Sequence, residues 1–176
     1  MAVASRSERT RRDIRWTSRP SGPSASTRAE ATTAFGAPDV RFEADLRRTT
    51  AKDGERLAAI VVASYAILDA VVAKAPATLR KGPRGGGRDR DKIVEHFVGS
   101  DGGYARVLGL KSPEIDPRDR KAVAELRKRM LEPIRAPSDG SPIAGKKWPA
   151  RYAARRIAWH ALDHAWEIED RSDPAE

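Results

Sequence analysis

Histidine is the residue of this sequence best suited to chemistry, and two of the three histidines, His160 and His164, stand four residues apart. On a helix, side chains at this spacing lie one above the other, with Cβ atoms about 5–6 Å apart. Two such imidazoles can bind one metal ion through Zn–N bonds of about 2.0–2.1 Å. Because the sequence contains no cysteine, any metal must be held by His, Asp or Glu.

The third histidine, His96, is predicted to lie on another helix at nearly the same depth as His160. In an up-and-down bundle the second and fourth helices run in the same direction, and the depths of these residues then differ by roughly 6 Å. The three histidines would therefore converge and leave one position of a metal ion open, as in catalytic zinc sites. The alternative is a chance spacing, because most histidines on an amphipathic helix are not metal ligands.

Acidic and basic side chains flank the histidines at helical spacing. Asp163 and Glu167 each follow a histidine by three residues, so each is a candidate to accept its free N–H, and Glu167 is also a candidate ligand. The competing interpretation is that both are solvated acids near a helix end. Arg156 precedes His160 by four residues on the same face and is a candidate to bind a substrate carboxylate in bidentate fashion.

Apolar residues at three- and four-residue spacing predict four helices. We expect them over residues 53–75, over residues 89–108, from Asp116-Pro117 onward, and from Trp148-Pro149 to about residue 171. Residues 41–46 are left open as a short strand or turn. The positions of the first helix that we expect in the core are Leu57, Ile60, Val61, Leu68, Val71 and Val72. The predicted fold is an all-α four-helix bundle of the up-and-down type.

Two basic loops lead into predicted helices. Residues 80–88 read RKGPRGGGR and precede the second helix, and Lys146-Lys147-Trp148 precedes the fourth. If these helices run parallel, both loops and both helix N-termini lie beside the histidines and attract anions. Arg84 and Arg88 are therefore candidate substrate-binding residues together with Arg156. A phosphate-binding loop is disfavoured, because the glycines follow no strand and lack the Lys-Ser/Thr pair of that motif.

The composition predicts three parts: a disordered extension rich in Arg and Ser over residues 1–38, a folded domain over residues 39–172, and a disordered tail over residues 173–176. The net charge of +9 points to nucleic acid as a partner. However, no DNA- or RNA-binding motif accompanies the charge, so we expect only weak, non-specific binding through the extension. We find no long apolar run and no secretion signal, and therefore expect a cytoplasmic protein without a membrane segment.

The segments KGPRGGGRDRDKIVEH and RYAARRIAWHALDHAWEIEDR resemble the DinB/YfiT-like superfamily of metalloenzymes, especially its actinobacterial members. The resemblance covers about residues 41–172 and includes one histidine on the second helix and HxxxH on the last. It implies a four-helix bundle, often a homodimer, in which His96, His160 and His164 bind a divalent ion, zinc or nickel. Relatives include mycothiol-dependent transferases and isomerases, and the resemblance implies no DNA binding.

Together, the residues and the resemblance predict a metal-dependent enzyme that uses a thiol such as mycothiol. It would act as a transferase or isomerase on a small anionic or electrophilic substrate, and Asp163 and Glu167 would support the ligands. A hydrolase would use the same open metal position for water. The alternatives are a non-catalytic metal-binding bundle of a stress response, and weak nucleic-acid binding through the N-terminal extension.

Overall fold

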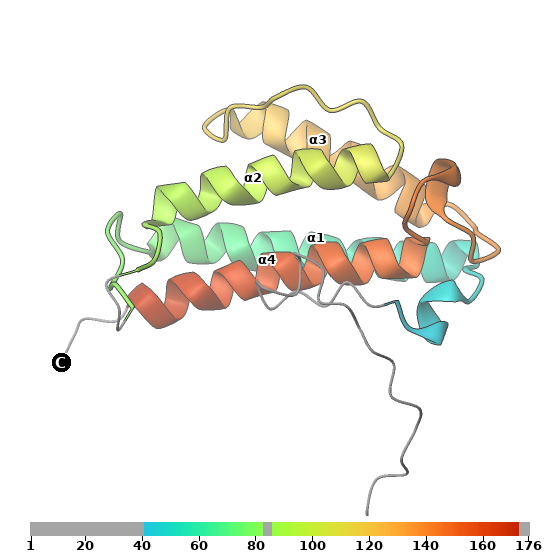
Figure 1. Ribbon diagram of the computed structural model, residues 1–176, viewed down its shortest axis with the longest axis horizontal. Coiled ribbons are helices and arrows are strands. Elements are labelled where there is room, and N and C mark those ends of the chain that lie inside the picture. Colours follow the sequence, from blue (N-terminus) through green and yellow to red (C-terminus); the bar gives the residue numbers. More distant parts are fainter. Residues whose placement is uncertain (1–40, 83–85, 173–176) are drawn as a thin grey trace, which may run out of the picture. The chain divides into compact units, whose positions relative to one another are not determined.

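The computed structural model describes residues 41–82 and 86–172, which belong to one compact unit. The predicted extension over residues 1–38, the tail over 173–176 and the candidate residue Arg84 lie outside the described residues. Within them the chain forms helices and no strand, which confirms the all-α prediction (Figure 1). The helices are η2 (Glu43–Leu46), α1 (Ala51–Lys74), α2 (Arg90–Val107), α3 (Arg120–Arg135), η3 (Ile143–Gly145) and α4 (Ala150–Ser172).

The predicted up-and-down order of the four α-helices is wrong. α1 and α2 are antiparallel, α3 runs in the same direction as α2, and α4 runs against both (Figure 1). The ring of Tyr104, near the end of α2, lies 5.1 Å from that of Trp148, just before α4. At the other end, the N–H of Arg80, in the loop before α2, donates to the carbonyl of Arg171 at the end of α4 (2.9 Å).

The connection between α2 and α3 explains this order. It covers residues 108–119, and such a segment can span about 40 Å when extended. The 18 residues of α2 span only about 27 Å. The connection is therefore long enough to return along the bundle before α3 begins, as the yellow segment in Figure 1 does. Only short connections force neighbouring helices to be antiparallel.

Polar side chains fix the starts of two helices. Thr50 caps α1: its hydroxyl accepts from the N–H of Asp53 (3.2 Å), whose carboxylate accepts from the N–H of Thr50 (3.1 Å). The third helix starts later than predicted, because Asp116 accepts from the N–H of Arg118 (2.9 Å) and closes a turn. Asp119 is the residue that caps α3, by accepting from the N–H of Ala122 (3.0 Å).

Residues 41–46, which were left open as a short strand or turn, form a short helix instead. One isolated bridge follows them before α1. Residues 43–46 form the 3-10 helix η2, and Thr49 pairs with Ser138 through two backbone hydrogen bonds of 2.8 and 3.0 Å. The buried carboxylate of Asp45 forms an ion pair with Arg155 of α4. This ion pair attaches the segment that precedes α1 to α4.

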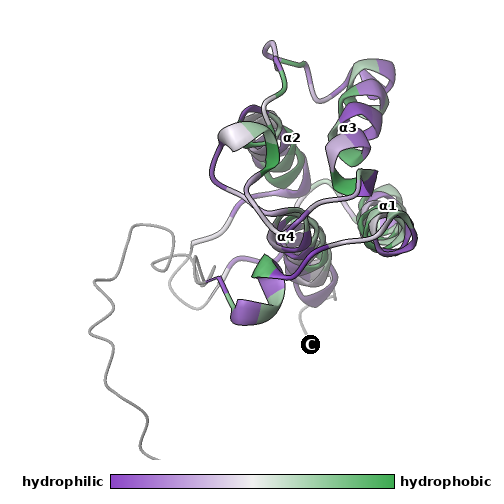
Figure 2. Cartoon of the chain, turned by 90° about the vertical axis from the view of Figure 1, so that its right-hand side faces the viewer, coloured by the Kyte–Doolittle hydropathy of each residue, from purple (hydrophilic) through white to green (hydrophobic). Residues whose placement is uncertain are grey.

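Small side chains let α4 pack closely against its neighbours. In the end-on view α4 lies between α1 and α2 (Figure 2). Six alanines of α4 are buried: Ala150, Ala153, Ala154, Ala158, Ala161 and Ala165. The larger core residues around them include Val61, Leu68, Ile93, Phe97, Leu126, Met130, Ile134, Ile157 and Ile168. A closely packed core on this face holds the histidines of α4 against α2.

α1 is apolar over much of its circumference (Figure 2). For this reason the sequence pattern does not show which side faces the core, and the prediction for Ile60 is wrong: it is 56% exposed. By length and composition alone α1 is also apolar enough to cross a membrane, a test that core helices of soluble proteins pass as well. The prediction that the protein has no membrane segment therefore stays a prediction.

Candidate metal centre

Three histidines from two helices meet between α2 and α4. One ring nitrogen from each of His96, His160 and His164 can be chosen so that all three lie within 4.8 Å of one another. The ring of His96 lies 5.6 Å from that of His160 and 5.2 Å from that of His164. His160 and His164 are buried, each 6% exposed, whereas His96 is exposed. The cluster is therefore anchored in the core and open to solvent on the side of α2.

The antiparallel arrangement of α2 and α4 produces this convergence. His96 lies six residues after Arg90, the start of α2, and His164 lies eight residues before Ser172, the end of α4. Residues at similar distances from opposite ends of antiparallel helices lie at the same depth. The sequence interpretation reached the same convergence by assuming parallel helices. His160 and His164 lie one turn apart near the middle of α4. His96 can therefore lie at the depth of one of them whether α2 and α4 are parallel or antiparallel.

Glu167 determines which nitrogen of His164 is available to a metal. Its Oε2 lies 2.8 Å from Nδ1 of His164, and its Oε1 accepts from Arg171 (2.9 Å). The hydrogen bond from His164 is the main cause that lowers the pKa of Glu167, so the carboxylate is ionised and can only accept. Nδ1 of His164 must then carry the proton, which leaves the lone pair on Nε2. A carboxylate behind a ligand histidine is the arrangement that orients metal-binding imidazoles.

His160 and His164 face each other through the same ring nitrogen, Nε2. Nε2 of His160 lies 3.1 Å from Nε2 of His164. Two nitrogens bound to one tetrahedral zinc at 2.0–2.1 Å are about 3.3 Å apart, so this distance fits a shared ion. Nδ1 of His160 is buried and has no hydrogen-bond partner within the described residues.

The surroundings of His160 keep it neutral, as a metal ligand must be. Its ring stacks on Phe97 at 5.1 Å and meets the edge of Tyr104 at 5.5 Å. Burial, followed by the neighbouring His164 and His96, lowers the pKa of His160 to about 3. Burial and the positive charge of Arg88 also lower the pKa of His96. The donor set and its spacing fit a divalent cation, and they fit zinc and nickel equally well.

The other candidate carboxylate does not join the centre. Asp163 is half-buried on α4, and no hydrogen bond or ion pair connects it to His160. Asp163 and Glu167 have the same spacing from their histidines, so that spacing does not distinguish them. They differ because Glu167 is longer and because Arg171 holds its carboxylate in place through the contact at 2.9 Å.

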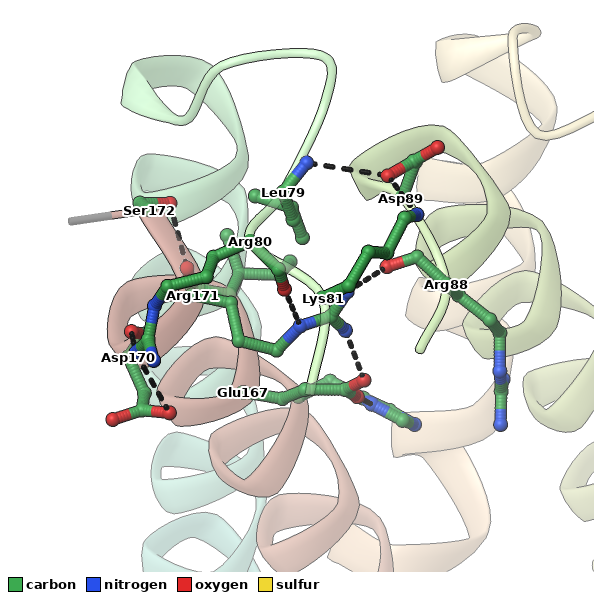
Figure 3. Close-up of polar contacts among 11 residues, drawn as sticks. Leu79, Arg80, Lys81, Arg88, Asp89, Glu167, Asp170, Arg171 and Ser172 are labelled. Carbon is green, nitrogen blue, oxygen red and sulfur yellow. Dashed lines mark hydrogen bonds and ion pairs between the residues drawn. The ribbon is translucent and has the colours of Figure 1, made fainter. Parts of the chain in front are cut away.

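Arg171 connects the metal centre to the glycine-rich loop, a role that the sequence interpretation missed. Its Nε donates to the carbonyl of Arg80 (2.8 Å) and its Nη2 to that of Arg88 (2.7 Å), while Nη1 binds Glu167 (Figure 3). Gly87 allows this approach, because it has a φ of +118° and an added Cβ would lie 2.7 Å from Nη2 of Arg171. The Glu-to-Arg spacing of four residues is the signal in the sequence that predicts the Arg171 contact.

A second carboxylate holds the same loop at the start of α2. Asp89 accepts from the N–H of Leu79 (3.2 Å) and from Nζ of Lys81 (2.6 Å), so its side chain binds the loop rather than capping the helix (Figure 3). The loop is therefore held at two points. Asp89 binds Leu79 and Lys81, and Arg171 of α4 binds the carbonyls of Arg80 and Arg88. Both points lie next to the segment that carries Arg88.

The basic candidate residues separate into two groups. Arg88 and Arg156 lie near the histidines, since the charge of each contributes to the lowered pKa of His160. Arg156 is buried on α4, and Arg88 is exposed. Lys146 and Lys147 lie before α4, at the opposite end of the bundle from the loop over residues 80–88. The prediction that both loops and the N-termini of both helices surround the centre is therefore wrong: of α2 and α4, only α2 has its N-terminus at that end.

The chain matches no protein-family model, no curated protein and no solved structure.

Proposed function

We propose that this protein is a metal-dependent enzyme of the DinB-like type, in which His96, His160 and His164 hold one zinc or nickel ion. The observation that carries the proposal is the meeting of the three ring nitrogens within 4.8 Å. The ionised Glu167 behind His164 supports it, because metal-ligating histidines usually donate their other ring N–H to such a carboxylate. The resemblance of the sequence to DinB/YfiT-like metalloenzymes agrees with this donor set.

The reaction that we propose uses a small thiol such as mycothiol. Three protein ligands leave a position at which a bound divalent ion lowers the pKa of a thiol and favours the thiolate as nucleophile. The chain contains no cysteine, so this thiol has to come from solution. His96 is exposed and leaves the centre accessible from the side of α2. The second substrate is a small electrophile, and the reaction is a transfer or an isomerisation.

The residues around the centre have separate tasks in this proposal. Glu167 orients His164. Phe97 and Tyr104 cover His160 and exclude water from its side. Arg88 and Arg156 supply positive charge for an anionic substrate, since the charge of each reaches the histidines. A cytoplasmic homodimer without membrane or specific nucleic-acid partners completes the proposal and rests on the sequence interpretation alone.

The test is a thiol-consumption assay on the zinc-loaded protein. Mycothiol or a simpler thiol is mixed with model electrophiles, and the loss of free thiol is followed with and without protein. We expect turnover in the wild type and none in His160→Ala at equal protein concentration. Hydrolysis of an ester or amide without thiol would favour the hydrolase instead. Bound metal without any turnover would favour the non-catalytic metal-binding bundle.

A further inference from the structure

Within the part of the chain that the structure describes, Arg156 is a buried cation without an anionic partner. The residue is 9% exposed, and its Nη1 is buried without a hydrogen bond to any described residue. Its guanidinium carbon lies 5.0 Å from the centre of the Trp159 ring. Two other arginines of α4 differ in this respect: Arg171 binds Glu167 and Arg155 binds Asp45. A buried charge normally requires a partner, because its desolvation costs several kcal/mol.

Arg156 lies next to the metal centre along α4. It lies one helical turn before His160 on the buried side of α4. Its charge acts on His160 and also on Tyr104, and the rings of these two residues are 5.5 Å apart. Arg156 therefore lies close enough for its charge to act on both rings. No hydrogen bond or ion pair joins Arg156 to a carboxylate of the described residues. Asp101, whose charge also acts on Tyr104, contacts Tyr65 and Arg127 instead, and Glu167 lies about three turns beyond Arg156 on α4.

The charge of the centre argues for an anion beside Arg156. A divalent ion held by three neutral histidines keeps its charge of +2, and Arg88 and Arg156 add to the local positive potential. Guanidinium groups bind carboxylates through two parallel hydrogen bonds, which are stronger than neutral ones. The orphaned Nη1 is one of the donors that such a pair would use.

We propose that Arg156 forms a carboxylate subsite beside the metal centre, so that the preferred ligand carries both a metal-binding thiol and a carboxylate. This inference rests on the proposed function and narrows its thiol to one with a free carboxylate, a group that mycothiol lacks. Arg156 and His160 are separated by about 6 Å along the helix axis, a distance that a short aliphatic chain and the reach of the guanidinium span together. Arg88, on the exposed side, attracts the anion but does not determine its binding position.

The experiment compares two thiols on the protein loaded with Co²⁺, which reports thiol binding through its absorption spectrum. 3-Mercaptopropionate carries a carboxylate, and 2-mercaptoethanol carries a neutral hydroxyl. We expect the wild type to bind 3-mercaptopropionate at least ~10-fold more tightly, since a hydrogen bond to a charged group contributes about 1.5–3 kcal/mol. We expect Arg156→Gln to lose this preference and Arg156→Lys to keep part of it.

Controls separate the subsite from general charge and from folding. Lys128→Gln removes one exposed positive charge on α3 and should leave the preference unchanged. Circular dichroism checks the fold of each variant, and the wild-type comparison of the two thiols is decisive even if Arg156→Gln unfolds. Equal affinity of the wild type for both thiols would overturn the subsite and leave the proposed function standing. Failure of the wild type to bind Co²⁺ would overturn the proposed function, and the subsite with it.

Discussion

Oε2 of Glu167 lies 2.8 Å from Nδ1 of His164, one turn earlier on α4. This contact leaves Nε2 of His164 free to bind, 3.1 Å from Nε2 of His160. The same carboxylate accepts from Arg171, whose other N–H groups hold the glycine-rich loop. Glu167 therefore links the proposed ligands to the segment that closes the bundle at this end.

Replacing Glu167 by alanine should weaken zinc binding. His164 would lose the partner that fixes its tautomer and ring orientation, and loss of such a partner costs about 10–100-fold in metal affinity. Competition with a chromophoric chelator measures the affinity. Glu169→Ala is the matched control, because Glu169 is exposed on the same helix. Equal zinc affinity in Glu167→Ala and the wild type would show that Glu167 does not support a ligand.

Gly87→Ala should destabilise the protein by about 1–3 kcal/mol, the usual cost of a side chain in a strained backbone conformation. Gly87 has a φ of +118°, and its new Cβ would lie 2.7 Å from Arg171. Urea unfolding measures the loss. Gly86→Ala is the neighbouring control, since a Cβ there meets nothing within 4 Å, and we expect a change within about 0.5 kcal/mol. Similar unfolding curves for both variants would contradict a close contact between Gly87 and Arg171.

The sequence predicted the helical content and the histidine cluster better than the order of the helices. HxxxH specifies its own geometry, because four residues make about one turn. The direction of α2 relative to α4 depends on the connection over residues 108–119, whose path follows from tertiary packing rather than from local preferences. Asp163 and Glu167 have the same spacing from their histidines, but only Glu167 is followed four residues later by an arginine. That spacing signals the ion pair with Arg171, whereas the position of Arg171 depends on Gly87 and on the carbonyls of a loop far away along the chain.

Asp101 should make stability fall as pH rises from about 4 to 7. It is 1% exposed, accepts from the hydroxyl of Tyr65 (3.3 Å) and lies 3.6 Å from Nε of Arg127. Burial raises the pKa of Asp101 to about 7, against 3.8 for an ordinary aspartate. Over this range the folded chain keeps the proton and the unfolded chain releases it, so rising pH favours unfolding.

The variant Asp101→Asn isolates this effect, because an amide can still accept from Tyr65 but does not titrate. The melting temperature of the wild type relative to Asp101→Asn should fall between pH 4 and pH 7. Taking the difference is necessary because His160, with its lowered pKa, contributes the opposite trend over part of the range. A difference that stays constant with pH would mean that Asp101 does not hold its proton in the folded protein.

The zinc content of the purified protein, measured by elemental analysis after equilibrium dialysis, tests the metal centre most directly. We expect about one ion per chain in the wild type and a clear loss in His160→Ala, because removing a ligand removes most of the binding free energy. Asp163→Asn should keep the ion, since no hydrogen bond or ion pair joins the Asp163 carboxylate to the three histidines. A wild type well below one ion per chain, or a His160→Ala variant that retains it, would contradict the metal centre.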